Sequence, residues 1–313
     1  MIENNFYTEM RNAFYTNYQQ NIVPAVRAFE KERKNKLLLA IILPPLLIAI
    51  AILLASLCAK FELNEFIKMP VAVLCYVLFI LSLCISLIIK KNFEIKVKNN
   101  IMPIVCSCFE DLKWSVPDSD KCNKIFPESG IIPRFSGSFY YEGFVGSHKG
   151  KNMEIVESEF WVGSGKSRRT VFKGVVIMLD VNKEFRSHTV ITPASLFKNS
   201  PVHNLKRTVL DIAEAEKNFD VFTNNEAETR CLITPIFMQK LMVLKTAFKS
   251  RGVRCAFYGN TILIALHTSK DLFSLCSLIR PIDDGKQYFK MYEEISSIVE
   301  FIDYFTLDQE IDL

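Results

Sequence analysis

Two long uncharged runs near the N-terminus constrain this chain more than any other feature. Residues 37–59, between Lys36 and Lys60, are 23 mostly aliphatic residues, and residues 69–89, between Lys68 and Lys90, are 21 more. A helix needs about 20 such residues to cross roughly 30 Å of hydrocarbon. Buried helices of a soluble core normally carry polar residues on one face, and these runs carry almost none. The pattern therefore predicts transmembrane helices over residues 37–59 and 70–89, joined by an external loop over residues 60–69.

A cleaved signal peptide is a poor alternative explanation of the first run. Thirty-six mostly polar residues precede it, and no small-x-small cleavage site follows. Pro44 and Pro45 fall inside this run, where they remove backbone donors and are expected to kink the helix. Both runs are thus expected to remain in the mature chain as a membrane hairpin.

The charges that flank the two runs predict their orientation. The connecting loop has only Lys60 and Lys68, which Glu62 and Glu65 balance. The outer flanks are rich in cations: Arg27, Lys31, Arg33, Lys34 and Lys36 before the first run, and Lys90, Lys91, Lys96 and Lys98 after the second. Because short cytoplasmic flanks carry excess Lys and Arg, both termini are expected to be cytoplasmic.

Cysteine usage indicates the redox environment of the chain, and net charge bears on whether its partner is a nucleic acid. Nine cysteines at irregular spacing indicate reduced thiols rather than a disulfide framework. The net charge of +4 is too mild to indicate a nucleic-acid partner.

The segments on either side of the hairpin have helical patterns. Residues 90–117 are expected to form a helical stalk that ends near Trp114. Residues 1–36 are expected to form one cytoplasmic amphipathic helix. Its apolar stripe is Phe6, Met10, Phe14, Tyr18, Ile22, Val26 and Phe29. Such a stripe suits an intramolecular contact or the seam of a homodimer.

From about Ser136 the periodicity changes to that of strands. Four β-rich stretches, 136–146, 152–163, 168–181 and 187–193, are close in sequence and are expected to pair as an antiparallel meander. A second β stretch, a helix over 226–250, a hairpin around Asn260 and a last helix over 286–306 follow. The fold class predicted is α+β: a transmembrane hairpin with a stalk, then an antiparallel β-meander domain with C-terminal helices over residues 118–313.

No catalytic, cofactor-binding or metal-binding residues emerge from the motifs. Gly163–Ser167 has the sequence GSGKS, but Phe160 stands where a phosphate-binding loop needs Gly, and a strand pattern follows instead of a helix. A basic hairpin turn is the better interpretation. Cys106 and Cys108 point to different faces of a helix, and no second ligand pair follows at zinc-site spacing.

The turns of the meander carry cations that could bind anionic lipid headgroups. Each cation near the membrane surface would contribute about 1 kcal/mol to the binding free energy. Ordinary solvated turns are the competing interpretation. Alternate turns of a meander lie at the same end of the sheet, so the candidates form two groups. One group is Lys149, Lys151, Lys183 and Arg186, and the other, at the opposite end, is Lys166, Arg168 and Arg169.

Residues 219–242, FDVFTNNEAETRCLITPIFMQKLM, resemble a bacterial family of membrane-hairpin proteins, domain of unknown function 3137. The lead into the first run, the segment TVFKGVVIMLDVNKEF and KDLFSL near Asp271 are also similar, whereas Cys231 replaces a commonly aromatic residue. The resemblance implies the hairpin topology, a bacterial origin and no particular reaction.

These patterns together favour a membrane-anchored interaction or scaffold module in the bacterial cytoplasmic membrane. Its expected partners are the lipid bilayer, a membrane or cytoplasmic protein, and a second copy through residues 1–36. No cofactor is expected. The alternative is an enzyme or ligand-binding protein that acts on a lipid or membrane-bound substrate. A deep polar pocket would favour this alternative, and a filled core with shallow grooves would favour the module.

Overall fold

The chain forms two compact units. The computed structural model describes residues 2–60, 65–109, 111–181, 184–195, 200–210, 212, 218–269, 273, 275–282 and 285–308. The helical unit comprises residues 1–108 and 274–288, and the sheet unit comprises residues 109–273 and 289–313. Each unit is described by itself.

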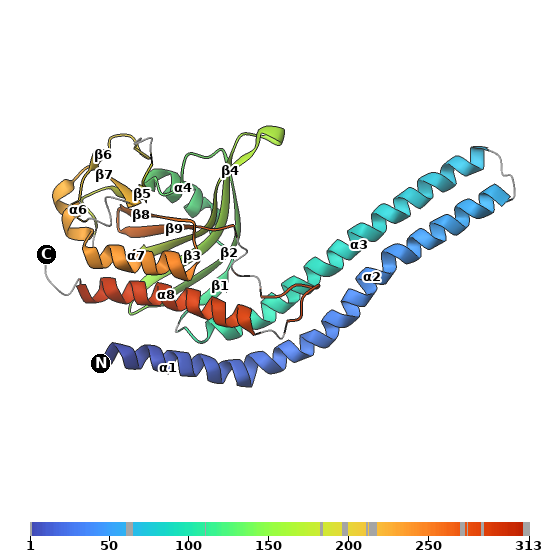
Figure 1. The fold of residues 1–313 in the computed structure, drawn as a ribbon, viewed down its shortest axis with the longest axis horizontal. Helices are drawn as coiled ribbons and strands as arrows, with labels where there is room; N and C mark the ends of the chain where they lie inside the picture. Colours follow the sequence, from blue (N-terminus) through green and yellow to red (C-terminus); the bar gives the residue numbers. More distant parts are fainter. Residues whose placement is uncertain are drawn as a thin grey trace. The chain divides into compact units, whose positions relative to one another are not determined.

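The helical unit consists of two long antiparallel arms (Figure 1). The first arm is α1 (Ile2–Asn17), a π-helical turn (Tyr18–Ile22) and α2 (Val23–Lys60), and the second is α3 (Glu65–Cys106). Both are long and apolar enough to cross a membrane, and the most apolar windows of the two arms are 0% and 6% buried. Because these aliphatic side chains are not covered by protein, the hairpin differs from the core helices of a soluble protein.

Three helix boundaries differ from expectation in this unit. The π-helical turn interrupts the expected single helix over residues 1–36, although Phe14, Ile22 and Val26 of its stripe are buried. α3 begins at Glu65, inside the expected loop 60–69, whose residues 61–64 lie outside the described part. α3 also ends at Cys106 rather than near Trp114, because the chain then turns into strand β1 (Lys113–Ser115).

A strap over residues 275–282 packs on the first arm within the helical unit. Arg33, 5% exposed, donates two hydrogen bonds to the Glu30 carboxylate, from Nε at 2.8 Å and from Nη2 at 2.7 Å. Its Nη1 donates to the Leu278 carbonyl at 2.8 Å, and the Ile282 amide donates to Glu30 at 3.2 Å. The ion pair on α2 therefore also holds the backbone of the strap.

Replacement of Arg33 by methionine is expected to release this strap. The change leaves the Glu30 carboxylate without its cation and removes the donor to Leu278, at a cost of about 3 kcal/mol. Hydrogen exchange at the Ile282 amide should accelerate roughly a hundredfold. Lys34→Met, at the exposed neighbouring position, is the matched control. Equal exchange in both variants would contradict the role assigned to Arg33.

The sheet unit is built on a nine-stranded antiparallel sheet. Its strand order is β1-β2-β3-β4-β9-β8-β5-β7-β6. The strands not yet given are β2 (Gly137–His148), β3 (Lys151–Val162), β4 (Arg169–Asp180), β5 (Thr189–Pro193), β6 (Lys206–Thr208), β7 (Phe219–Thr223), β8 (Gly252–Tyr258) and β9 (Thr261–His267).

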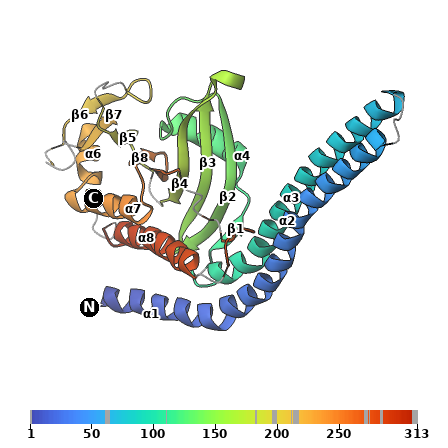
Figure 2. The same ribbon diagram turned by 45° about the vertical axis from the view of Figure 1, so that its right-hand side comes forward.

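The expected meander is correct for β2, β3 and β4 but wrong for the next strand. β4 pairs with β9 from Gly174↔His267 to Asp180↔Thr261, while β5 pairs with β7 and β8. The β8–β9 hairpin is thus inserted between strands that are neighbours in sequence, and Figure 2 shows β8 between β5 and β4. Sequence proximity predicts pairing only while no later strand takes the same edge.

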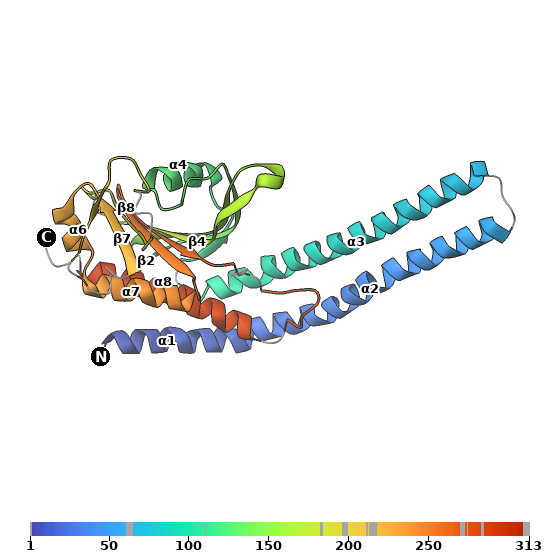
Figure 3. The same ribbon diagram turned by 45° about the horizontal axis from the view of Figure 1, so that its top comes forward.

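Helices cover both faces of the sheet (Figure 3). One face carries α4 (Ser119–Ser129), which Asp118 caps by accepting from the amides of Asp120 and Lys121. The other carries α7 (Pro235–Ala247) and α8 (Lys286–Asp308), where the ring of Phe237 of α7 contacts Phe257 of β8 in a tilted arrangement and Phe301 of α8 edge to face. Cover on both faces explains why β9 reads as an almost uninterrupted apolar run.

The expected helix over residues 226–250 is two helices. α6 (Glu226–Leu232) ends before Thr234, and α7 begins at Pro235. The proline ring disfavours helical backbone at the preceding residue, and the Thr234 hydroxyl accepts a hydrogen bond from the Phe237 amide at 3.1 Å. The last helix was expected over 286–306 and runs from Lys286 to Asp308.

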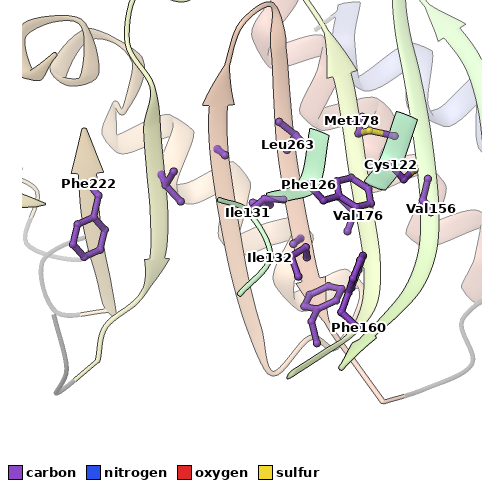
Figure 4. Close-up of a cluster of buried hydrophobic side chains, with 14 of the residues drawn as sticks. Cys122, Phe126, Ile131, Ile132, Val156, Phe160, Val176, Met178, Phe222 and Leu263 are labelled. Atoms are coloured by element: carbon purple, nitrogen blue, oxygen red, sulfur yellow. The ribbon is translucent and has the colours of Figure 1, made fainter. Parts of the chain in front are cut away.

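The core between α4 and the sheet sets the floor of the site described below. Figure 4 shows Phe126 of α4 close to Val176, with Ile131 and Ile132 on the segment that follows α4. Phe126 meets Phe160 edge to face with ring centroids 5.8 Å apart. Phe172 of β4 and Phe222 of β7 belong to the same cluster, which therefore extends across the sheet to β7.

Candidate functional site

The cationic turns occupy the two ends of the β2–β4 sheet, as their register requires. His148↔Lys151 closes one turn, and Val181 at the end of β4 lies at the same end, since its amide donates to Asn260 beside the Asp180↔Thr261 pair. The turn that contains Lys166 joins β3 to β4 at the other end. GSGKS is therefore a hairpin turn with a short 3-10 segment (Gly165–Ser167) and not a phosphate-binding loop.

The turn at Lys149 is tied to α8 within the sheet unit. Lys149 Nζ lies 2.7 Å from Asp303 Oδ1, and His148 Nε2 lies 2.8 Å from the same oxygen. Lys151 is half-buried, and Arg186 is exposed with its amide donating to Glu228 at 3.2 Å. Lys183 lies outside the described residues. Lys149 is thus already neutralised by an acidic side chain of its own unit.

The opposite turn presents cations beside an aromatic ring. Arg168 stacks on Trp161, with its guanidinium carbon 3.6 Å from the ring centroid, and its Nη2 lies 3.4 Å from Glu159 Oε1. Lys166 and Arg169 are exposed. A tryptophan beside exposed cations is typical of residues at a lipid–water interface. A membrane contact at this end of the sheet stays a prediction.

Two adjoining pockets lie on the α4 face of the sheet unit. One has a volume of about 180 Å³ and apolar walls formed by Pro133, Val171, Phe172 and Pro193. The other, of about 460 Å³, has polar walls that include Thr192, Ser195, Ser200 and Asp220. Pro133, Pro193 and Arg254 line both pockets, so Arg254 stands at their junction.

Arg254 is held in the middle of the sheet. It lies on β8, opposite Ala265 of β9 and one residue before Cys255, which pairs with Ile191 of β5. Because side chains alternate along a strand, Arg254 shares the face of Ala256, which belongs to the α4 core. The backbone of β8 is fixed by its pairing with β9 along its whole length and with β5 from Cys255 to Phe257.

Arg254 has no acidic partner among the residues that the structure describes. Its Nε is buried without a hydrogen bond. Burial lowers the pKa of Arg254 to about 10, so the guanidinium remains protonated at neutral pH. Burial, and then the charge of Arg251, lower the pKa of His267, which lines the smaller pocket. The site therefore holds a fixed positive charge beside an imidazole that favours its neutral form.

The one carboxylate that lines the larger pocket is already engaged. Asp220 of β7 accepts a hydrogen bond from Arg207 Nε at 2.8 Å and another from the Ser195 amide at 3.0 Å. Arg134 and Arg251 line the pockets from exposed positions, and no described carboxylate pairs with either. The pockets thus carry an excess of positive charge.

This site was missed in the sequence, although one signal was present. VRCAFY places a single charged residue inside a strand that is otherwise apolar or aromatic. Such a residue is either at an edge or in a pocket. Only the strand order distinguishes an edge position from a pocket, and it places β8 in the middle of the sheet.

Fold and site together define an α+β domain, with a cationic pocket on one sheet face, in a chain that has two potential membrane-spanning helices. A family model described as "Protein of unknown function (DUF3137)" matches residues 170–307, from β4 to α8. This match confirms the resemblance seen in the sequence over residues 170–307. No curated protein and no solved structure matches the chain.

Proposed function

We propose that this protein is a membrane-anchored interaction module. In this proposal α2 and α3 cross a bacterial cytoplasmic membrane as a hairpin, both termini are cytoplasmic, and the sheet unit is presented at the cytoplasmic surface. The observation that supports it is the exposed aliphatic surface of the two long helices, such as Ile50 and Ile80, 39% and 41% exposed. Such a surface is stable in hydrocarbon and costly in water.

The cations that flank the two helices support this orientation, because short cytoplasmic loops are enriched in Lys and Arg. A protein partner in the membrane or cytoplasm, and a homodimer through residues 1–36, are part of the same proposal.

Membrane anchoring is tested by alkaline carbonate extraction of membranes that contain the full chain. The wild type is expected to stay in the pellet, and a C-terminal fluorescent fusion should fold on the cytoplasmic side. A double variant, Ile50→Arg and Ile80→Arg, places one charge near the middle of each apolar run. Each charge is expected to raise the free energy of membrane insertion by about 2.5–3.5 kcal/mol. This double variant should move to the supernatant.

Ile236→Arg is the matched control, because Ile236 is 53% exposed on α7 and lies outside the apolar helices. Extraction of the wild-type chain by carbonate, or retention of the double variant as complete as that of Ile236→Arg, would contradict anchoring by the hairpin.

The adjoining pockets around Arg254 favour a second candidate function, the binding of a small ligand or lipid headgroup. A solely scaffolding domain gains nothing from a guanidinium Nε that is buried without a hydrogen-bond partner, which costs folding free energy. A bound anion would recover that cost.

A further inference from the structure

Arg254 identifies the chemistry of the ligand that the pockets suit. Arg254 is partly exposed to the pockets, but its Nε is buried without a hydrogen-bond partner, so this donor has lost its hydration and gained no hydrogen bond in return. Its planar donors match two oxygens of a carboxylate or phosphate. An oxyanion at the junction of the two pockets would supply the acceptors that the described protein residues do not.

Charge distinguishes between these two oxyanions. Asp220 is balanced by Arg207, 2.8 Å away, so it does not compensate the other cations of the pockets. Arg134, Arg251 and Arg254 remain, all lining the same two pockets. Three uncompensated positive charges suit a phosphate of charge about −1.5 to −2 better than a carboxylate of charge −1.

The walls indicate what the phosphate is attached to. The larger pocket offers the hydroxyl-bearing residues Thr192, Ser195 and Ser200, which suit a hydrated oxyanion. The smaller pocket offers Val171, Phe172 and two prolines, which suit a short apolar group. A phosphate at Arg254 would lie between these two environments.

We propose that the adjoining pockets bind a phosphate monoester, with Arg254 as the central bidentate donor and Arg134 and Arg251 as outer cations. The inference rests on the second function proposed above. The same chemistry is offered by a soluble organic phosphate and by the headgroup of phosphatidic acid.

The test uses the full chain in neutral detergent micelles and isothermal titration calorimetry. Glycerol 3-phosphate is the soluble probe, and vesicles of phosphatidylcholine with and without phosphatidic acid are the lipid probe. Saturable binding of glycerol 3-phosphate supports the site with a soluble source. Binding only to vesicles that contain phosphatidic acid supports it with a lipid source. Binding of neither probe by the wild type would overturn the proposal.

The variant that carries the test is Arg254→Met, which keeps an unbranched side chain and removes the charge. Affinity is expected to fall about tenfold or more, since a charge-assisted bidentate contact is lost. The thermal midpoint without ligand should stay the same or rise, because a partly buried charge with an unpartnered Nε is removed. A merely structural arginine would instead lower the midpoint and leave affinity unchanged, which would overturn the proposal.

Arg280→Met is the matched control, because Arg280 is an exposed arginine of the strap over residues 275–282 and does not line either pocket. It should bind the probe as the wild type does. An equal loss of affinity in both arginine variants would show diffuse electrostatic attraction and overturn the assignment to Arg254. Carbonate extraction of Arg254→Met reports anchoring separately, so failure of the pocket and failure of the membrane hairpin are distinguishable.

Discussion

Phe126→Ala is expected to lower the free energy of unfolding of the sheet unit by about 3–5 kcal/mol, the typical cost of truncating a buried phenylalanine. Phe126 is fully buried between α4 and the sheet. It meets Phe160 at 5.8 Å and Tyr140 at 6.2 Å between ring centroids. Truncation removes the apolar contacts of the ring and leaves a cavity. The cavity cannot close, because the strands beside it are held in place by their hydrogen-bonded neighbours.

Tryptophan fluorescence during urea unfolding measures this effect selectively. The chain has two tryptophans, and both Trp114 on β1 and Trp161 on β3 belong to the sheet unit. Phe139→Ala is the matched control, because Phe139 is 53% exposed on β2. We expect the control to lose about 1 kcal/mol or less. A loss in Phe126→Ala no larger than in the control would show that α4 does not seal this core.

Gly174→Ala is the second change for which a large loss is expected, about 3 kcal/mol or more. Gly174 of β4 has φ +154°, and a Cβ there would lie 2.0 Å from the Leu266 carbonyl oxygen on β9. The obstacle is backbone that is itself hydrogen-bonded in the sheet, since Gly174 is paired with His267. Relief therefore requires the β4–β9 pairing to shift.

The control for this change is Gly150→Ala in the β2–β3 turn. Gly150 has φ +73°, but an added Cβ meets nothing within 4 Å. Its cost is the left-handed backbone strain alone, about 1–2 kcal/mol. Hydrogen exchange of β9 amides should accelerate in Gly174→Ala and remain unchanged in Gly150→Ala. Equal unfolding free energies for the two variants would contradict the clash with β9.

The predictions that the structure confirms rest on local patterns in the sequence. Two uninterrupted apolar runs specify two long helices because no other element fits more than 20 apolar residues in a row. Period-two alternation located β2, β3 and β4, and the turn residues around Asn260 located the β8–β9 hairpin. These signals depend on neighbours within a few residues.

The errors at element ends came from contacts that span the sequence. The segment before Trp114 reads as helix, but Trp114 pairs with Phe144 of β2 and becomes an edge strand. The interruption at Thr234-Pro235 had a local signal that the apolar periodicity outweighed. Tertiary pairing outweighs local propensity where it satisfies more backbone hydrogen bonds.

By itself, the sequence determined the apolar hairpin, the α+β class and the positions of most strands, because each depends on periodicity along the chain. Only the tertiary structure decided that β9 lies beside β4 and that β8 is central. That order turns Arg254 from one charged residue in an apolar strand into a partly buried cation at the junction of two pockets. The reason is physical: the cost of an unpaired charge depends on what surrounds it in space, and strands distant in sequence provide those surroundings.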